Sequence, residues 1–200
     1  MPHPADAPGP APARRPLRVA VVGAECTGKT TLAAALAAHY DARWLPEFVR
    51  GFVERKCGAV EAADVPRIAR GHLGAEAAAL TNAPSVLFLD TDLVSTCVYS
   101  RYYYGACPAW VEAASYARHA DLYLLAEADI PWQPDPGQRD GPEVRAAVQV
   151  LLRAELSARR LPHVVLSGPL DARLRTATRA VDARLGGGAP PSPPAATPSR

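Results

Sequence analysis

One run of the sequence has the residue types and spacing of a phosphate-binding loop. It is Gly-Ala-Glu-Cys-Thr-Gly-Lys-Thr at residues 23–30, where two glycines with four residues between them are followed directly by Lys29 and Thr30. Glycines let the backbone wrap around phosphate oxygens, a lysine neutralises the β- and γ-phosphates, and a threonine hydroxyl is a ligand for Mg²⁺. The run matches the Walker A pattern in full, and it predicts ATP and Mg²⁺ as cofactors.

The lysine of this loop stands out against the composition of the chain. Lysine and arginine together number 22, yet Lys29 is one of only two lysines. An arginine would not act on a phosphate as the same compact point charge, so we predict that Lys29 is catalytic. The predicted nucleotide-binding residues are Gly23, Ala24, Glu25, Cys26, Thr27, Gly28, Lys29, Thr30 and Thr31.

Two carboxylates follow the apolar run at residues 86–89. Asp90 ends this run, where a P-loop protein places the carboxylate that holds Mg²⁺ together with the threonine of the loop. We predict that Thr30 and Asp90 bind the metal, while capping of the next helix is the alternative for Asp90. For Asp92 two interpretations stay open, because it either contacts the substrate or caps the run that begins at Leu93.

A third carboxylate, Glu47, comes just after an extended segment at residues 42–45. In a parallel sheet this position lies beside the P-loop, where a carboxylate accepts the proton of a hydroxyl that attacks the γ-phosphate. We predict that Glu47 is catalytic and binds substrate; the alternative is a solvated glutamate that the dipole of a helix start favours. Arg50, one helical turn later, either holds substrate or pairs with Glu47.

The proline-broken segment at residues 129–140 is typical of a lid. We predict that Arg139 is catalytic because a lid arginine brings positive charge to a transferring phosphoryl group. We predict that Trp132 binds substrate by stacking on, or packing over, a ring. The alternatives are a surface charge for Arg139 and a hinge-packing role for Trp132.

A scaffold must bring these segments together. Short apolar runs indicate strands at residues 17–22, 42–45, 85–90, 121–126 and 163–166. Helical patterns occur at residues 30–40, 48–53, 62–80, 93–103 and 141–160. Strands without polar alternation, separated by helices, indicate an α/β fold with a parallel sheet buried on both faces. Ligands gather at the carboxyl ends of such strands, which is where the predicted site residues stand.

The bulk composition is ordinary for a folded protein except in its proline content. The hydrophobic share is 48% and the charged share is 21%, and 11 of the 21 prolines lie in residues 1–16 and 186–200. We therefore expect one domain at residues 17–185 between disordered tails at residues 1–16 and 186–200. The net charge of +2 and the scattered arginines give no reason to expect nucleic-acid or membrane binding. Apolar runs are short, so a cytoplasmic location is expected.

Taken in order, the motifs resemble the nicotinamide riboside kinase domain of the bacterial NadR proteins, within a wider AAA-type P-loop family. The resemblance covers roughly residues 17–180. It rests on the P-loop, on Pro-Glu-Phe-Val-Arg at residues 46–50, on Leu-Asp-Thr-Asp at residues 89–92, and on Asp-Ile-Pro-Trp at residues 129–132 followed by Arg139. It implies a three-layer P-loop nucleoside-kinase-like fold with a five-stranded parallel sheet and a helical lid.

The resemblance also implies a reaction, the ATP-dependent phosphorylation of the 5′-hydroxyl of nicotinamide riboside to nicotinamide mononucleotide in NAD salvage. Lys29, Thr30 and Asp90 carry over as phosphate and magnesium residues. The pocket and lid positions that carry over are Glu47, Arg50, Asp92, Trp132 and Arg139. NadR proteins carry a nucleotidyltransferase domain before the kinase and often a DNA-binding region, and we expect both to be absent because residues 1–16 are too few for either.

Two rival functions stay open at this point. The first is a kinase of the same fold for another nucleoside. The second is a P-loop ATPase that acts as a nucleotide-dependent regulatory or binding protein. Acceptor-stimulated release of ADP distinguishes a kinase from such a regulator.

Overall fold

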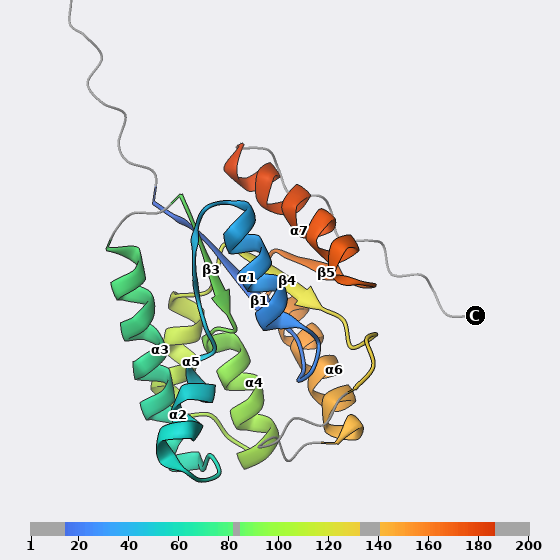
Figure 1. Cartoon of the computed structure of the whole chain (residues 1–200). Coiled ribbons are helices and arrows are strands. Elements are labelled where there is room, and N and C mark those ends of the chain that lie inside the picture. The colour runs from blue at the N-terminus through green and yellow to red at the C-terminus, as the bar shows by residue number, and fades with distance from the viewer. Residues whose placement is uncertain (1–14, 82–84, 133–140, 187–200) are drawn as a thin grey trace, which may run out of the picture.

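The computed structural model describes residues 15–81, 85–132 and 141–186, and within them five parallel strands form one sheet (Figure 1). The strands are β1 (Leu17–Val22), β2 (Arg43–Leu45), β3 (Val86–Asp90), β4 (Leu122–Ala126) and β5 (His163–Leu166). Their order across the sheet is β2-β3-β1-β4-β5. Strand β1 pairs with both β3 and β4, so its carboxyl end lies between those of two neighbours. Such a position is where open α/β sheets bind ligands.

Helices cover both faces of this sheet. They are α1 (Lys29–His39), α2 (Phe48–Lys56), α3 (Val65–Leu80), α4 (Leu93–Tyr104), α5 (Ala109–Ala117), α6 (Pro142–Ala158) and α7 (Leu170–Leu185), with a short 3₁₀ turn η1 (Ala62–Asp64) before α3. Figure 1 shows α1 and α7 on one face and α3, α4 and α6 on the other. The fold is therefore the predicted three-layer α/β arrangement with a five-stranded parallel sheet.

The strands are buried because both of their faces meet helices. All five residues of β3 and all five residues of β4 are buried. Alternate residues of β1 point to opposite faces, with Val19 and Val21 packed toward α1 and α7 and Ala20 and Val22 packed toward α4 and α6. Apolar burial on both faces holds the sheet in place, and it fixes the carboxyl ends of the strands relative to one another.

A buried charged cluster joins α3 to the amino end of β1, far along the strand from the P-loop. Glu76 is 1% exposed, and Oε1 of Glu76 lies 2.6 Å from Nη2 of Arg18. His72, one turn earlier on α3, is also buried, with Nε2 3.8 Å from Oε2 of Glu76. Burial first, and then the positive charges of Arg18 and Arg118, lower the pKa of His72 to about 4, in spite of the nearby glutamate.

The sequence analysis did not identify two of the helices, α5 and α7. Helix α5 packs against α4, and helix α7 packs against α1 and β5. Only Arg173, Ala177, Ala180 and Val181 of α7 are buried, so this helix has a narrow apolar stripe among many arginines. That narrow stripe gives a weak periodic signal in the sequence.

The predicted tails fall largely outside the described residues. Of the amino-terminal tail, Arg15 is described, and its guanidinium donates two hydrogen bonds to the carboxylate of Asp121, at 2.6 and 3.2 Å. Of the carboxyl-terminal tail, Gly186 is described as the residue that ends α7. The division into one domain and two tails stays a prediction. No helix within residues 15–81, 85–132 and 141–186 is long and apolar enough to cross a membrane.

Candidate functional site

The P-loop connects β1 to α1 and takes a conformation that needs its glycines. Gly23 has a φ of +152°, and a Cβ atom there would lie only 2.6 Å from the backbone oxygen of Ala126 on the neighbouring strand. Gly28 has a φ of +78° and precedes the first residue of α1. Cys26 also has a positive φ, at +53°. Glycine is thus required at residue 23 by a close approach of two backbones, and it is favoured at residue 28 by the left-handed conformation.

The amino end of α1 has the features of an anion site. No side chain of the described residues caps this helix, and its first turn has no acidic residue. The first N–H groups of a helix have no partner inside the helix, and they carry partial positive charge. Lys29 is only 8% exposed, and its Nζ lies 2.9 Å from the backbone oxygen of Ala24, so its charge stays against the loop. Phosphate groups suit such a position.

Thr30 and Asp90 meet at the predicted metal site. The hydroxyl of Thr30 donates a hydrogen bond of 2.6 Å to Oδ2 of Asp90 at the end of β3. The other carboxylate oxygen, Oδ1, is buried, and no group of the described residues hydrogen-bonds to it. Burial raises the pKa of Asp90, while Thr30, Lys29 and Arg50 act in the opposite direction. A hydroxyl and a carboxylate oxygen without a partner are a donor set that fits Mg²⁺.

Glu47 lies at the start of α2, within electrostatic reach of the same cluster. It is partly buried, and it precedes the first residue of α2. Burial raises the pKa of Glu47, the charge of Asp90 raises it further, and the charges of Lys29 and Arg50 lower it. Arg50 is exposed, and its charge acts on both Glu47 and Asp90. The fold thus brings Glu47 close to the P-loop lysine and the predicted metal carboxylate, as the sequence predicts.

Asp92 caps α4, which was one of its two open interpretations. Its Oδ1 accepts hydrogen bonds from the backbone N–H groups of Val94 and Ser95, at 3.0 and 3.2 Å. Its Oδ2 accepts a hydrogen bond of 2.6 Å from the hydroxyl of Tyr123 on β4. Only 3% of Asp92 is exposed, so both carboxylate oxygens are engaged in a buried network. This geometry favours the capping interpretation, and a substrate contact for Asp92 stays a prediction.

The predicted lid residues are only partly covered by the structure. Trp132 is partly buried and is the last described residue of its segment. Arg139 lies outside the described residues, so its catalytic role stays a prediction. The described start of the segment lies next to the P-loop, since a Cβ atom on Gly28 would meet Cδ1 of Ile130 at 3.7 Å.

Three buried polar side chains that the sequence analysis missed contact the P-loop from helices α6 and α7. Gln149 accepts a hydrogen bond from the N–H of Ala24 at 2.9 Å and donates one to the backbone oxygen of Ala126 at 3.0 Å. Arg145 donates to the backbone oxygen of Cys26, and Arg173 donates to that of Thr27.

A sequence signal for these residues does exist. The buried residues of α6 are Arg145, Val148, Gln149, Leu152 and Leu156, which recur at helical spacing. The polar residues in such a stripe point toward the interior, where a buried polar group needs a partner. Arg173 has the same relation to the apolar stripe of α7.

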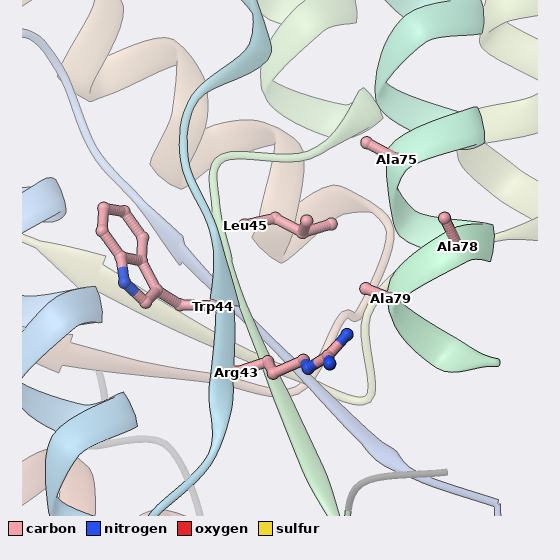
Figure 2. Close-up of a pocket in the computed structure, with 6 residues that line it drawn as sticks. All are labelled: Arg43, Trp44, Leu45, Ala75, Ala78 and Ala79. Carbon is pink, nitrogen blue, oxygen red and sulfur yellow. The ribbon is translucent and has the colours of Figure 1, made fainter. Parts of the chain in front are cut away.

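A surface groove of about 470 Å³ lies away from this site, between β2 and α3 (Figure 2). It is lined by Arg43, Trp44, Leu45, Ala75, Ala78 and Ala79. Figure 2 shows the side chain of Leu45 directed toward α3 and that of Trp44 on the opposite side of the strand. None of the predicted site residues that the structure describes lines this groove, so we do not assign it to the reaction.

Comparison with known proteins identifies a family model that matches this chain and a relative of similar sequence. A family model described as an AAA domain matches residues 18–173. The trifunctional NAD biosynthesis/regulator protein NadR of Salmonella typhimurium is 31% identical to this chain over 174 residues, which are 84% of this chain and 42% of the relative. This chain therefore spans less than half the length of that relative.

Solved structures show the same fold. NadR in complex with NAD and AMP-PNP matches with a TM-score of 0.68 and 26% identity, covering 90% of this chain and 52% of that chain. NadR in complex with NR matches with a TM-score of 0.67 and 26% identity, covering 89% of this chain and 54% of that chain. Thymidylate kinase from Ehrlichia chaffeensis matches with a TM-score of 0.61 at 13% identity, covering 84% of this chain and 100% of that chain, a likeness of fold alone. The predicted resemblance to NadR and the nucleoside-kinase-like fold are confirmed.

Proposed function

This chain belongs to the family of AAA domains, and we propose that it is an ATP-dependent kinase that phosphorylates nicotinamide riboside to nicotinamide mononucleotide. The observation that carries this proposal is the position of Glu47, whose carboxylate is within electrostatic reach of Lys29 and Asp90. Binding of a nucleotide alone does not need this third charge, whereas transfer of a phosphoryl group to a hydroxyl benefits from a carboxylate that accepts its proton. The similarity to NadR, solved in complex with NR, supports this choice of acceptor.

In the proposed reaction the P-loop holds the phosphates of ATP. The amino end of α1 and the side chain of Lys29 neutralise their negative charge. Thr30 and Asp90 would hold Mg²⁺, which when bound reduces the charge repulsion within the triphosphate. The residues of the loop thereby position the γ-phosphate for attack.

Glu47 acts on the acceptor. It orients the 5′-hydroxyl of the riboside, and it takes up the proton of that hydroxyl as the new bond to the γ-phosphorus forms and the bond from the γ-phosphorus to the leaving ADP breaks. Its raised pKa makes it a better proton acceptor than a fully exposed glutamate.

We propose further that Arg50 and Trp132 contact the acceptor. An acceptor contact for Asp92, whose carboxylate caps α4 and binds the hydroxyl of Tyr123, stays a prediction. Arg139 would add positive charge to the transferring group.

The proposal includes the setting of the enzyme. We propose that residues 17–185 form one P-loop domain that works in the cytoplasm on a small-molecule acceptor. The near-balanced net charge of +2 gives no electrostatic reason for a nucleic-acid or membrane partner.

The proposal is tested with the purified chain, Mg²⁺ and ATP. Release of ADP is followed with each member of a panel of nucleosides, with nicotinamide riboside among them, and without any acceptor. We expect nicotinamide riboside to stimulate ADP release and to gain the mass of one phosphoryl group. If a different nucleoside stimulates ADP release, that nucleoside is the acceptor in place of nicotinamide riboside. Slow ADP release that no nucleoside stimulates would support a regulatory ATPase instead.

A further inference from the structure

Two consecutive backbone oxygens of the P-loop are held by buried arginines from separate helices. Nη2 of Arg145 on α6 donates to the oxygen of Cys26 at 3.2 Å. Nη1 of Arg173 on α7 donates to the oxygen of Thr27 at 2.7 Å. Arg145 is 7% exposed and Arg173 is 3% exposed. Both side chains therefore act on the loop from the protein interior.

This contact fixes the direction of two amide groups. A trans peptide is planar, and its C=O and N–H bonds point in opposite directions. When the oxygens of Cys26 and Thr27 are bound by Arg145 and Arg173, the N–H groups of Thr27 and Gly28 must point away from the two arginines. Converging N–H groups of this kind form the phosphate-binding surface of a P-loop.

The same two arginines also bind the segment that follows β4. Arg145 donates to the backbone oxygen of Ile130 at 2.9 Å. Arg173 donates through Nη2 to the backbone oxygen of Glu127 at 3.0 Å and to the carboxylate of Asp129.

Arg173 is also linked to the loop after β5. Its Nε donates to the backbone oxygen of Gly168 at 2.7 Å, and the carboxylate of Asp129 accepts a hydrogen bond of 2.6 Å from the N–H of Gly168. Arg173 thus reaches acceptors on three connections at one edge of the sheet. The planar, forked donor set of an arginine makes this possible, whereas a lysine has a single ammonium group.

We propose that Arg145 and Arg173 are positioning residues for nucleotide binding, which set the amides of Thr27 and Gly28 toward the phosphates by holding the two preceding carbonyl groups. The inference rests on the proposed function only in assuming that the loop binds ATP. It concerns no acceptor.

The test uses the full chain and separates the positive charge of Arg173 from its forked set of hydrogen-bond donors. Arg173→Lys keeps the positive charge and can keep the pair with Asp129, but it loses the fork. We expect this variant to bind Mg²⁺ and ATP at least about tenfold more weakly than wild type in calorimetric titration, because a charge alone does not orient the Thr27 peptide. Arg175→Lys, on the same helix in an exposed pair with Asp171, serves as the matched control and should bind normally. Wild-type affinity in Arg173→Lys would overturn the proposal.

A second measurement, by nuclear magnetic resonance, reports only on the folded molecules and so separates the orientation of the peptides from a loss of folded protein. In wild type, the amide resonances of Thr27 and Gly28 should be among those that move furthest when ATP is added, and the shift of the Gly28 resonance should shrink in Arg173→Lys. A merely structural role for Arg173 would lower the melting temperature and leave these shifts unchanged in the folded variant. Amides that do not respond to ATP in wild type would contradict the inference. No acceptor is present in either titration, so failure to phosphorylate nicotinamide riboside would not affect the result.

Discussion

The hydroxyl of Thr30 and the carboxylate of Asp90 are joined by a hydrogen bond of 2.6 Å between the first turn of α1 and the end of β3. This bond leaves the second oxygen of Asp90 buried and without a partner among the described residues. A buried carboxylate oxygen without a partner is costly, and a bound cation relieves that cost.

Substitutions at Asp90 and Thr30 should therefore impair the use of Mg²⁺ in the reaction. Asp90→Asn should lower kcat at least about a hundredfold, since charge neutralisation is a main contribution to phosphoryl transfer. Thr30→Ala should raise the Mg²⁺ concentration needed for half-maximal rate, whereas Thr30→Ser keeps a hydroxyl and should stay close to wild type. Kinetics at varied Mg²⁺ concentration provide the measurement. Equal Mg²⁺ dependence in Thr30→Ala and wild type would argue against the metal role.

The carboxylate of Glu47 should be needed for a high kcat but should contribute little to the affinity for ATP. Glu47→Gln should lower kcat by about 10²–10⁴-fold and leave the dissociation constant for ATP within about twofold of wild type. Glu54→Gln, an exposed position on the same helix, is the control and should change neither quantity. Loss of ATP affinity in Glu47→Gln would rule out the role assigned to this residue.

The raised pKa of Glu47 predicts the direction of the pH dependence. The carboxylate is the active form, and it is lost as the pH falls through a pKa that is higher than that of an ordinary glutamate. The kcat of wild type should thus begin to fall at a higher pH than an exposed glutamate would give. A pH profile of kcat checks this. The residual kcat of Glu47→Gln should not show the fall that protonation of Glu47 causes in wild type.

Gly23 should not tolerate a side chain. Gly23→Ala places Cβ 2.6 Å from the backbone oxygen of Ala126, in a backbone conformation that L-residues rarely adopt. We expect it to lower the free energy of unfolding by about 1–3 kcal/mol and to weaken ATP binding. Gly74→Ala is the matched control, because a Cβ there meets nothing within 4 Å on helix α3, and it should stabilise by roughly 0.5–1 kcal/mol. Denaturant unfolding measures both, and the same sign in both variants would contradict the expectation.

His72 should make the protein less stable in acid. Its pKa falls from the ordinary 6.5 to about 4 on folding, so the unfolded chain binds a proton that the folded chain does not. The contribution of this group to the free energy of unfolding should be fully present above pH 6.5, and the free energy of unfolding should fall by about 3 kcal/mol as the pH approaches 4. His72→Gln cannot take up this proton and should lose less stability over the same range. Parallel pH curves of unfolding free energy for the two proteins would show that His72 is not responsible.

Much of this molecule follows from local sequence patterns. The five apolar runs predict the strands because buried parallel strands need no polar alternation, and the match of the P-loop is independent of the rest of the fold. The closeness of Glu47 to the P-loop follows from one further step, since parallel strands end at a common edge.

What the sequence did not predict depends on packing between distant segments. Arg145 and Arg173 belong to the buried stripes of α6 and α7, which directs them toward the interior, but only the position of the two helices against the P-loop reveals which groups they contact. For Asp92 the sequence left capping and substrate contact equally open. The residue that engages its second carboxylate oxygen, Tyr123, lies on a strand 31 residues away, and local sequence does not show that contact.

The most direct test of the account is the transfer of labelled phosphate from γ-labelled ATP to nicotinamide riboside. We expect label in nicotinamide mononucleotide with wild type, no label when 5′-deoxy nicotinamide riboside replaces the acceptor, and none with Lys29→Ala. Label that appears only as inorganic phosphate, at a rate that the riboside does not change, would contradict the account.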